Sequence, residues 1–111
     1  PIYGKGENIR DWIYVEDHCA GILGVHFAGE VGEKYNIGGE CEIKNLDIVK
    51  LIIKLMNASE DLIEFVDDRP GHDLRYAIDN AKIYETTSFQ PEFSIEDGLK
   101  KTIAWYEKNR D

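Results

Sequence analysis

The chain has 111 residues, of which 42% are hydrophobic and 32% are charged, a composition typical of one soluble globular domain. Acidic residues outnumber basic residues 22 to 13, so the formal net charge is −9. A chain this acidic is not expected to bind nucleic acid or an anionic membrane. Any anionic ligand must therefore meet a local group of cations, which directs attention to Arg10, Arg69 and Arg75.

The sequence contains no apolar run long enough to cross a membrane and shows no signal-peptide pattern at its start. Cys19 and Cys41 form neither a disulfide framework nor a close metal pair. His18, His26 and His72 lack the HExxH spacing of a zinc site. We therefore expect a cytoplasmic protein with reduced thiols and no bound metal.

Residue patterns in the first third of the chain predict loops, short strands and one helix. Glu16 or Asp17 is expected to cap the helix, and the spacing of Gly21 and Gly24 suggests a face on which another segment packs closely. The predicted elements are a Gly-rich loop over residues 1–8, a strand over 11–15, a helix over 17–27, a turn over 29–33 and a strand over 34–38.

The remainder of the chain is dominated by two amphipathic helices. Asn45 is a natural N-cap for the first, and Ser94 with Asp97 approximates a capping box for the second. The pattern predicts a helix over residues 46–56, a strand over 62–66, a loop from 68, a strand over 76–78, a short helix over 79–83 and a last helix from Ser94. Residues 1–111 are thus expected to form a single α+β (mixed α/β) domain, with a small sheet and about three to four helices.

Residues 68–76 (Asp-Arg-Pro-Gly-His-Asp-Leu-Arg-Tyr) are the most informative stretch of the chain. The Pro-Gly pair is unfavourable in a helix or a strand, so these residues are expected to form a loop. Arg69 carries two donors in the geometry that a phosphate accepts, and the glycine lets the backbone approach a ligand. The same residues also fit an ordinary turn in which Arg69 pairs with Asp67 or Asp73.

The sequence offers no convincing catalytic set. It lacks a G-x-S-x-G elbow and a Tyr-x-x-x-Lys pair, and its cysteines have no evident activating base. The Gly4-Lys5-Gly6 triplet resembles part of a phosphate loop, but it follows no predicted strand and lacks the third glycine of a nucleotide fingerprint.

Each candidate binding residue also has a plain structural interpretation. Arg10 either meets an anion or pairs with a neighbouring carboxylate, and Tyr3 either stacks on a base or sugar or packs at the rim of the core. Asn45 either contacts a ligand or caps its helix. His72 either contacts a ligand or orients its own backbone.

Two long blocks resemble dTDP-glucose 4,6-dehydratases, extended short-chain dehydrogenase/reductase enzymes of the NAD-dependent epimerase/dehydratase family. The first block is P-I-Y-G-K-G-E-N-I-R-D-W-I-Y-V-E-D-H at residues 1–18, and the second is D-R-P-G-H-D-x-R-Y-A-I-D at residues 68–79. Shorter matches are Y-N-I-G-G at 35–39, K-N-L at 44–46 and G-L-K-K-T at 98–102. The resemblance covers nearly the whole chain.

The resemblance implies that the chain is the C-terminal, nucleotide-sugar-binding part of such an enzyme, without the N-terminal Rossmann domain that holds NAD. In the family, the substrate lies between these two parts. The residues implied to bind it are Pro1, Ile2 and Tyr3 around the nucleotide, Arg10 and Arg69 at the diphosphate, and Asn45 with Asp68, Pro70, Gly71 and His72 completing the site.

The activity implied for the parent enzyme is that of a NAD-dependent lyase, which converts dTDP-glucose to dTDP-4-keto-6-deoxyglucose. The family's catalytic residues and its Gly-rich NAD loop lie upstream of the matching blocks. The 111-residue chain is therefore expected to be inactive, to bind no NAD and to hold at most the nucleotide-diphosphate part of a dTDP-sugar. Loss of the Rossmann partner is also expected to expose an apolar face and to promote self-association.

Two alternatives to this function remain. The chain is either part of a sibling nucleotide-sugar epimerase or decarboxylase, or it is a non-catalytic binding or assembly module.

Overall fold

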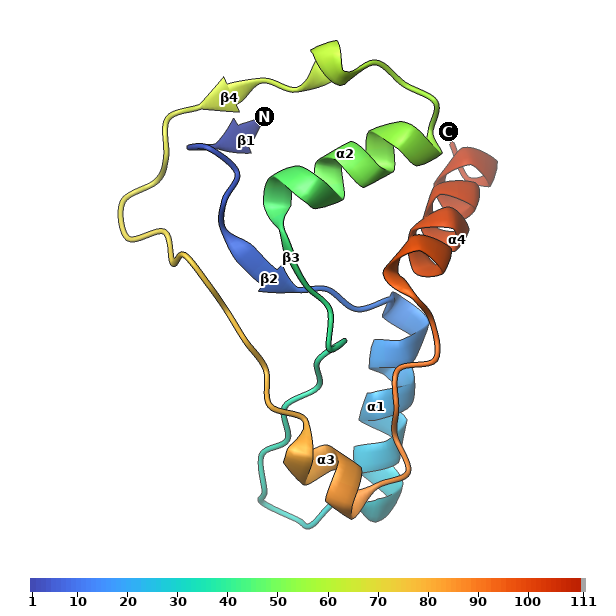
Figure 1. Ribbon diagram of the computed structural model, residues 1–111. Coiled ribbons are helices and arrows are strands. Elements are labelled where there is room, and N and C mark those ends of the chain that lie inside the picture. Colours follow the sequence, from blue (N-terminus) through green and yellow to red (C-terminus); the bar gives the residue numbers. More distant parts are fainter. Residues whose placement is uncertain (111) are drawn as a thin grey trace.

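The computed structural model describes residues 1–110, and over that range it contains four α-helices and four short strands. In chain order they are β1 (Ile2–Tyr3), β2 (Ile9–Asp11), α1 (Val15–Ala28), β3 (Glu42–Lys44), α2 (Asn45–Leu55), a 3-10 turn (Glu60–Leu62), β4 (Phe65–Val66), α3 (Ala81–Thr86) and α4 (Ile95–Lys108). Figure 1 shows α2 near α4 at one end of the molecule and α3 beside α1 at the other. The predicted class, a mixed fold with a small sheet and about three to four helices, is confirmed.

The strands form two pairs, and both pairs join segments that lie far apart in the sequence. β1 pairs with β4 in parallel, with Ile2 opposite Phe65, and β2 pairs with β3 in antiparallel orientation. An isolated parallel bridge also joins Ile9 to Arg75. The first eleven residues are therefore held by three other parts of the chain.

The predicted strand at residues 11–15 is wrong in position. β2 ends at Asp11, and β1 lies inside the segment that was expected to be a loop. The backbone N–H of Trp12 still donates to the Cys41 carbonyl oxygen at 2.9 Å. The chain then enters α1 at Val15, which leaves no length for a strand between these two points.

The predicted strand at residues 34–38 is also wrong, since none of these described residues joins a ladder. The reason is a buried side chain that takes the place of a strand partner. The Asn80 amide accepts from the Gly38 N–H at 2.8 Å and donates to the Gly38 carbonyl oxygen at 2.9 Å. β3, which was not predicted, lies a few residues later and has no β-branched run to mark it.

The other two predicted strands are shorter than expected. Of residues 62–66, Phe65 and Val66 form β4, while Leu62 closes a 3-10 turn that begins where the Ser59 hydroxyl accepts from the Asp61 N–H at 3.2 Å. Among residues 76–78, all of them described, no strand forms, and the ladder there is limited to the bridge at Arg75.

The predicted helices are confirmed, but the predicted cap of the first helix is wrong. α1 has Tyr14 at its N-cap without a side-chain hydrogen bond, and neither Glu16 nor Asp17 caps it. α3 begins at Ala81, whose N–H donates to the Asp79 carboxylate at 2.8 Å.

α4 begins as predicted. The Ser94 hydroxyl accepts from the Asp97 N–H at 3.1 Å and donates to the Asp97 carboxylate at 2.8 Å, which satisfies a backbone donor at the helix start. The side chains of α4 that were expected to be buried become exposed toward its end, where Tyr106 is 64% exposed.

The core is small for a chain of this length. The buried apolar side chains described are Ile2, Ile48, Ile83 and Phe89, of which Ile83 is fully buried. The radius of gyration is 16.3 Å, compared with about 13 Å for a compact domain of this size. Large apolar side chains are correspondingly exposed, among them Phe27 on α1 at 81% and Trp105 on α4 at 60%. Among residues 1–110, no helix combines the length and the apolar character that crossing a bilayer requires.

The two glycines of α1 provide a direct test of this packing. A Cβ atom added at Gly21 would lie 2.8 Å from Ile37 Cγ2, whereas one added at Gly24 would lie 3.5 Å from Thr87 Cβ. Alanine has a higher helix propensity than glycine by the same amount at both positions, so this gain in stability cancels when the two variants are compared. We expect Gly21→Ala to be less stable than Gly24→Ala by about 1–3 kcal/mol, the usual cost of overpacking.

Urea unfolding of the two variants, followed by circular dichroism, measures this difference. Equal midpoints for the two variants would contradict the close contact at Gly21.

Candidate functional site

Two groups of predicted binding residues, one at the start of the chain and one in the loop at 68–72, meet at one end of the β1–β4 pair. The Ile2 N–H donates to the Glu64 carbonyl oxygen at 2.7 Å, and the Gly4 N–H donates to the Val66 carbonyl oxygen at 2.9 Å. Because the two strands are parallel, the turn after β1 and the loop after β4 leave from the same edge. Tyr3 and the loop at 68–72 are thereby brought together.

The turn after β1 is closely packed against this loop. Gly4 has a φ of +57°, and a Cβ atom added there would lie 3.0 Å from Asp68 Oδ2. The Tyr3 ring stands edge-on to the His72 ring, with centroids 6.2 Å apart and an interplanar angle of 82°. Tyr3, which is 51% exposed, therefore reaches the surface beside His72.

Asp68 is the acceptor that organises its own loop. Its Oδ1 atom lies 2.7 Å from His72 Nδ1 and accepts from the Arg69 N–H at 2.9 Å. The hydrogen bond with His72, opposed by partial desolvation and aided by the Arg69 N–H, holds the pKa of Asp68 below its usual range. Asp68 is therefore an ionised acceptor at neutral pH, directed at protein groups.

A second fixed point of the site lies where the same loop returns to β2. The Ile9 N–H donates to the Leu74 carbonyl oxygen at 2.7 Å, and the Tyr76 N–H donates to the Ile9 carbonyl oxygen at 3.1 Å. The Asn8 side chain, which is buried, donates to the Asp73 carbonyl oxygen at 3.0 Å. The loop between residues 67 and 74 is thus attached at both ends.

Arg10 lies on an aromatic ring at this second point. Its guanidinium carbon is 4.4 Å from the centre of the Tyr76 ring, and its N–H groups donate to the carbonyl oxygens of Ile9 (2.7 Å) and Asp73 (3.1 Å). The pairs with Asp11 or Glu7 that were considered from sequence are not among the ion pairs of the described residues. Since a guanidinium has five N–H donors, Arg10 keeps several for a ligand.

Arg69 lies close enough to Tyr76 to affect it electrostatically. The Tyr76 hydroxyl donates to the Asp73 carboxylate, and this bond raises the pKa of Tyr76, while the charges of Arg10 and Arg69 oppose the rise. The two positive charges therefore act on the pKa of the same hydroxyl group. Neither predicted ion pair of Arg69, with Asp67 or Asp73, is formed among the described residues.

Arg75, the third arginine noted in the sequence, has a structural role. Its Nε and Nη2 atoms contact the two carboxylate oxygens of Glu42 at 2.6 and 2.9 Å. This two-point pair lowers the pKa of Glu42 and connects β3 to the loop. Arg75 is therefore occupied, in contrast to Arg10 and Arg69.

Asn45 is the first residue of α2, and its predicted role as N-cap is wrong. Lys44 takes the cap position, and no side-chain hydrogen bond caps the helix. The Asn45 N–H donates to the Asn8 carbonyl oxygen at 2.9 Å. Its half-buried side chain makes no hydrogen bond to any described residue, so its amide is available to a ligand.

The remaining predicted residues differ in what they offer. The Ile2 side chain is 5% exposed and belongs to the core, so it lines a surface site only through its backbone. Pro1 and Pro70 are exposed. Gly71 has a φ of +68°, and a Cβ atom added there would have no neighbour within 4 Å.

Sequence reasoning missed three residues of this region. Tyr76 and Asp73 position Arg10, and Asn8 fixes the returning loop. Tyr76 had been assigned to a strand. For Asn8, the available signal in the sequence was an asparagine beside a Gly-rich turn. The Gly4-Lys5-Gly6 turn does follow a strand, contrary to the prediction, but it leads into β2 and not into a helix.

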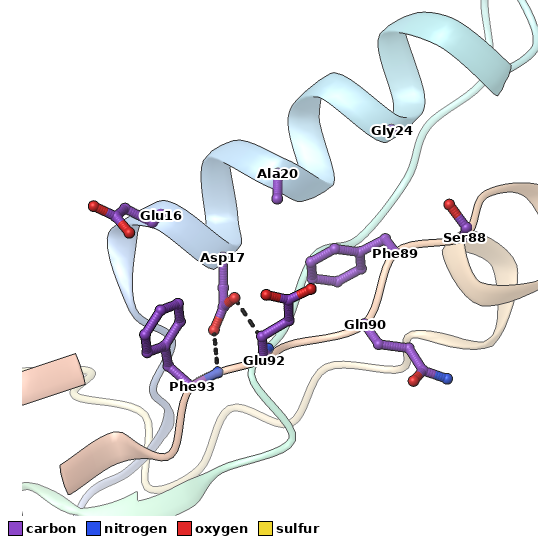
Figure 2. A pocket seen from close by; sticks show the side chains of 9 residues that line it. All are labelled: Glu16, Asp17, Ala20, Gly24, Ser88, Phe89, Gln90, Glu92 and Phe93. Carbon is purple, nitrogen blue, oxygen red and sulfur yellow. Dashed lines mark hydrogen bonds between the residues drawn. The ribbon is translucent and has the colours of Figure 1, made fainter. Parts of the chain in front are cut away.

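A separate pocket of about 310 Å³ lies along α1 and contains none of the predicted binding residues. Figure 2 shows that its floor is the connector before α4, held by the buried carboxylate of Asp17. This carboxylate accepts from the N–H groups of Glu92 and Phe93, both at 3.0 Å. Asp17 therefore anchors a loop, which explains why it does not cap its helix. Within residues 1–110, no group of three His, Cys, Asp or Glu side chains is arranged to hold a metal ion.

Known proteins resemble the chain over nearly its whole length. The family model described as GDP-mannose 4,6 dehydratase matches residues 1–102, so the chain belongs to this family. A dTDP-glucose 4,6-dehydratase from Haemophilus influenzae is 47% identical over 117 residues, which cover 96% of this chain and 35% of that protein.

Two solved structures show the same fold. The crystal structure of dTDP-glucose 4,6-dehydratase from Bacillus anthracis in complex with NAD has a TM-score of 0.89 and 47% identity, and covers 98% of this chain and 34% of that one. The Streptomyces venezuelae enzyme DesIV, with NAD and TYD bound, has a TM-score of 0.92 and 41% identity, and covers 99% of this chain and 34% of that one. The chain thus spans about a third of the length of these relatives.

The Arg75–Glu42 pair gives a testable dependence of stability on pH. Because the folded-state pKa of Glu42 is lowered, its contribution is present above the ordinary glutamate pKa of about 4.3 and is lost as pH falls through the folded-state value. We expect Glu42→Gln to be less stable than the unchanged chain at pH 7, and this difference to vanish at acidic pH.

Thermal unfolding between neutral and acidic pH measures the difference. Glu64→Gln is the matched control, since the Glu64 carboxylate makes no ion pair with the described residues. A difference for Glu42→Gln that persists unchanged in acid would contradict the assignment.

Proposed function

We propose that the chain forms one side of the nucleotide-sugar site of a dTDP-glucose 4,6-dehydratase and binds the nucleotide-diphosphate part of the substrate. The observation that carries this proposal is the position of Arg10 on the ring of Tyr76, at one end of the loop that carries Arg69 and brings His72 to Tyr3. Arg10 and Arg69 have unused N–H donors that can bind a diphosphate, and on a chain with a net charge of −9 such a ligand needs local cations. The identity of 47% to dTDP-glucose 4,6-dehydratases supports the choice of nucleotide-sugar.

Within this proposal each residue has a distinct task. Arg10 is held rigid by two carbonyl oxygens and by the Tyr76 ring, so it offers a preorganised donor to one phosphate. Arg69 is exposed and closes on the diphosphate when ligand arrives. Tyr3 lies beside the nucleotide, and Asn45 offers its amide to the same ligand.

The described residues do not fit NAD. A dinucleotide site requires a Gly-rich turn that opens a helix, whose N-terminus binds the pyrophosphate. The Gly4-Lys5-Gly6 turn leads instead into β2, and a Cβ atom at Gly6 would meet Ile2 and Leu46, so that face is already filled by protein. We therefore propose that NAD binds to the part of the relatives that this chain does not span.

The reaction proposed for the complete enzyme is oxidation of dTDP-glucose at C4, loss of water across C5 and C6, and return of the hydride to give dTDP-4-keto-6-deoxyglucose. The chain itself contributes binding and orientation, and we propose that it carries out none of these steps alone. Cys19 and Cys41 are free thiols, which suits the cytoplasm as its compartment.

Arg69→Ala tests the diphosphate contact. A hydrogen bond to a charged group contributes about 1.5–3 kcal/mol, so loss of the Arg69 guanidinium is expected to weaken dTDP binding about 10-fold to 100-fold. Isothermal titration calorimetry on the 111-residue chain gives the affinities, with UDP and GDP as competing nucleotides. The chain is expected to favour dTDP, whereas a preference for UDP or GDP would indicate a sibling epimerase or decarboxylase.

Arg110→Ala is the matched control, because it removes the same charge beside a separate apolar pocket at the end of α4. Equal affinities for Arg69→Ala and Arg110→Ala would contradict the proposed site. Absence of any nucleotide binding by the unchanged chain would favour a non-catalytic assembly module.

We also propose that a partner domain covers the exposed apolar side chains in the complete enzyme, and that these side chains cause self-association when the partner domain is absent. Phe27 and Leu23, on one side of α1, are 81% and 56% exposed. Light scattering is expected to show a mass that grows with concentration, and Leu23→Gln with Phe27→Gln is expected to reduce that growth. A constant monomeric mass for the unchanged chain would rule out this association.

A further inference from the structure

Both carboxylate oxygens of Asp68 contact protein groups, although the side chain is 48% exposed. Its Oδ2 atom packs against the turn at Gly4, where a Cβ atom would lie only 3.0 Å away. Its Oδ1 atom accepts from the Arg69 N–H at 2.9 Å and lies 2.7 Å from His72 Nδ1. An aspartate used in this way is poorly placed to contact an anionic ligand, which its charge would also repel.

His72 is the group on which Asp68 acts. Its side chain is 6% exposed, and its ring is fixed between the Asp68 carboxylate and the edge of Tyr3. An ionised carboxylate is an acceptor only, so the hydrogen of this short contact belongs to His72 Nδ1. In a neutral imidazole with hydrogen on Nδ1, the other nitrogen, Nε2, carries the lone pair.

The Nε2 atom of His72 is not used by the described part of the chain. No hydrogen bond joins it to residues 1–110. No side-chain nitrogen or oxygen that is fully buried within this range lacks a partner, so Nε2 retains access to the surface. The ring thus has one nitrogen committed to Asp68 and one nitrogen open.

We propose that Asp68 is a positioning residue that acts through His72, holding the imidazole with hydrogen on Nδ1 so that Nε2 accepts a hydrogen bond from a sugar or ribose hydroxyl of the nucleotide-sugar. The proposal rests on the proposed function for its ligand, while the fixed tautomer is a property of the chain alone. Besides the Asp68 carboxylate, the charged group next to His72 is Arg69 of the same loop. β1 contributes the phenol of Tyr3 on the other side.

The tautomer is measured first, without ligand. Nitrogen NMR chemical shifts of His72, recorded at a pH high enough for neutral histidines, distinguish hydrogen on Nδ1 from hydrogen on Nε2. His72→Phe identifies the His72 signals among the three histidines. We expect the Nδ1–H form in the unchanged chain and in Asp67→Asn, and a shift toward the Nε2–H form in Asp68→Asn, whose amide can donate to Nδ1. An Nε2–H form in the unchanged chain, or no shift in Asp68→Asn, would overturn the proposal.

A double-mutant cycle then tests the action through His72. Asp68→Asn and His72→Phe are each expected to weaken binding of dTDP-glucose about 10-fold in calorimetry, and the double variant is expected to bind no more weakly than His72→Phe alone. Additive losses would mean that Asp68 contacts the ligand itself and would overturn the proposal. If the unchanged chain binds no dTDP, the proposed function fails, and the tautomer measurement still decides whether Asp68 fixes His72.

Discussion

The site depends on the attachment of one loop at both of its ends. Parallel pairing with β1 fixes the loop where β4 ends, and the two backbone hydrogen bonds of Ile9 fix it again at residues 74–76. Every other feature of the site follows from these two attachments. Tyr3 meets His72 because the segments after β1 and β4 leave from the same end of the strand pair, and Arg10 meets Tyr76 because β2 pairs with the returning end of the loop.

Backbone pairing is well suited to this task because it does not depend on the side chains that we propose bind a ligand. Each N–H and carbonyl group that leaves water must find a partner, so the first eleven residues and the loop stabilise each other irrespective of what Arg69 or His72 contacts. Asn8 adds a buried amide to the same junction. The side chains proposed to bind the ligand therefore project from a framework whose geometry is already set.

Helices were predictable from the sequence, while strands and their partners were not. The 3.6-residue pattern of α2 and the Ser94 cap of α4 are local signals that survive folding. The strands are only two or three residues long, and their positions are decided by partners that lie far away in the chain. Gly38 shows the limit clearly, because the hydrogen bonds expected from a strand come from the side chain of Asn80.

For the site, residue chemistry predicted an anion-binding loop, and family resemblance supplied the list of candidate binding residues. Neither source indicated which arginine was occupied. Arg75 and Arg69 lie in the same loop, and their difference arises from Glu42, a residue of β3 brought to Arg75 by the fold. The contact of Asp68 with the turn at Gly4 likewise depends on the pairing of β1 with β4.

Gly71 illustrates a constraint of a different kind. Its left-handed φ of +68° occurs in a position where a Cβ atom would touch nothing, so space does not exclude a side chain there. The exclusion is conformational, since an ordinary L-residue favours other backbone angles by about 1–2 kcal/mol. A side chain at position 71 would therefore leave the packing of the protein intact and would lower the fraction of time in which the loop adopts the backbone conformation described here.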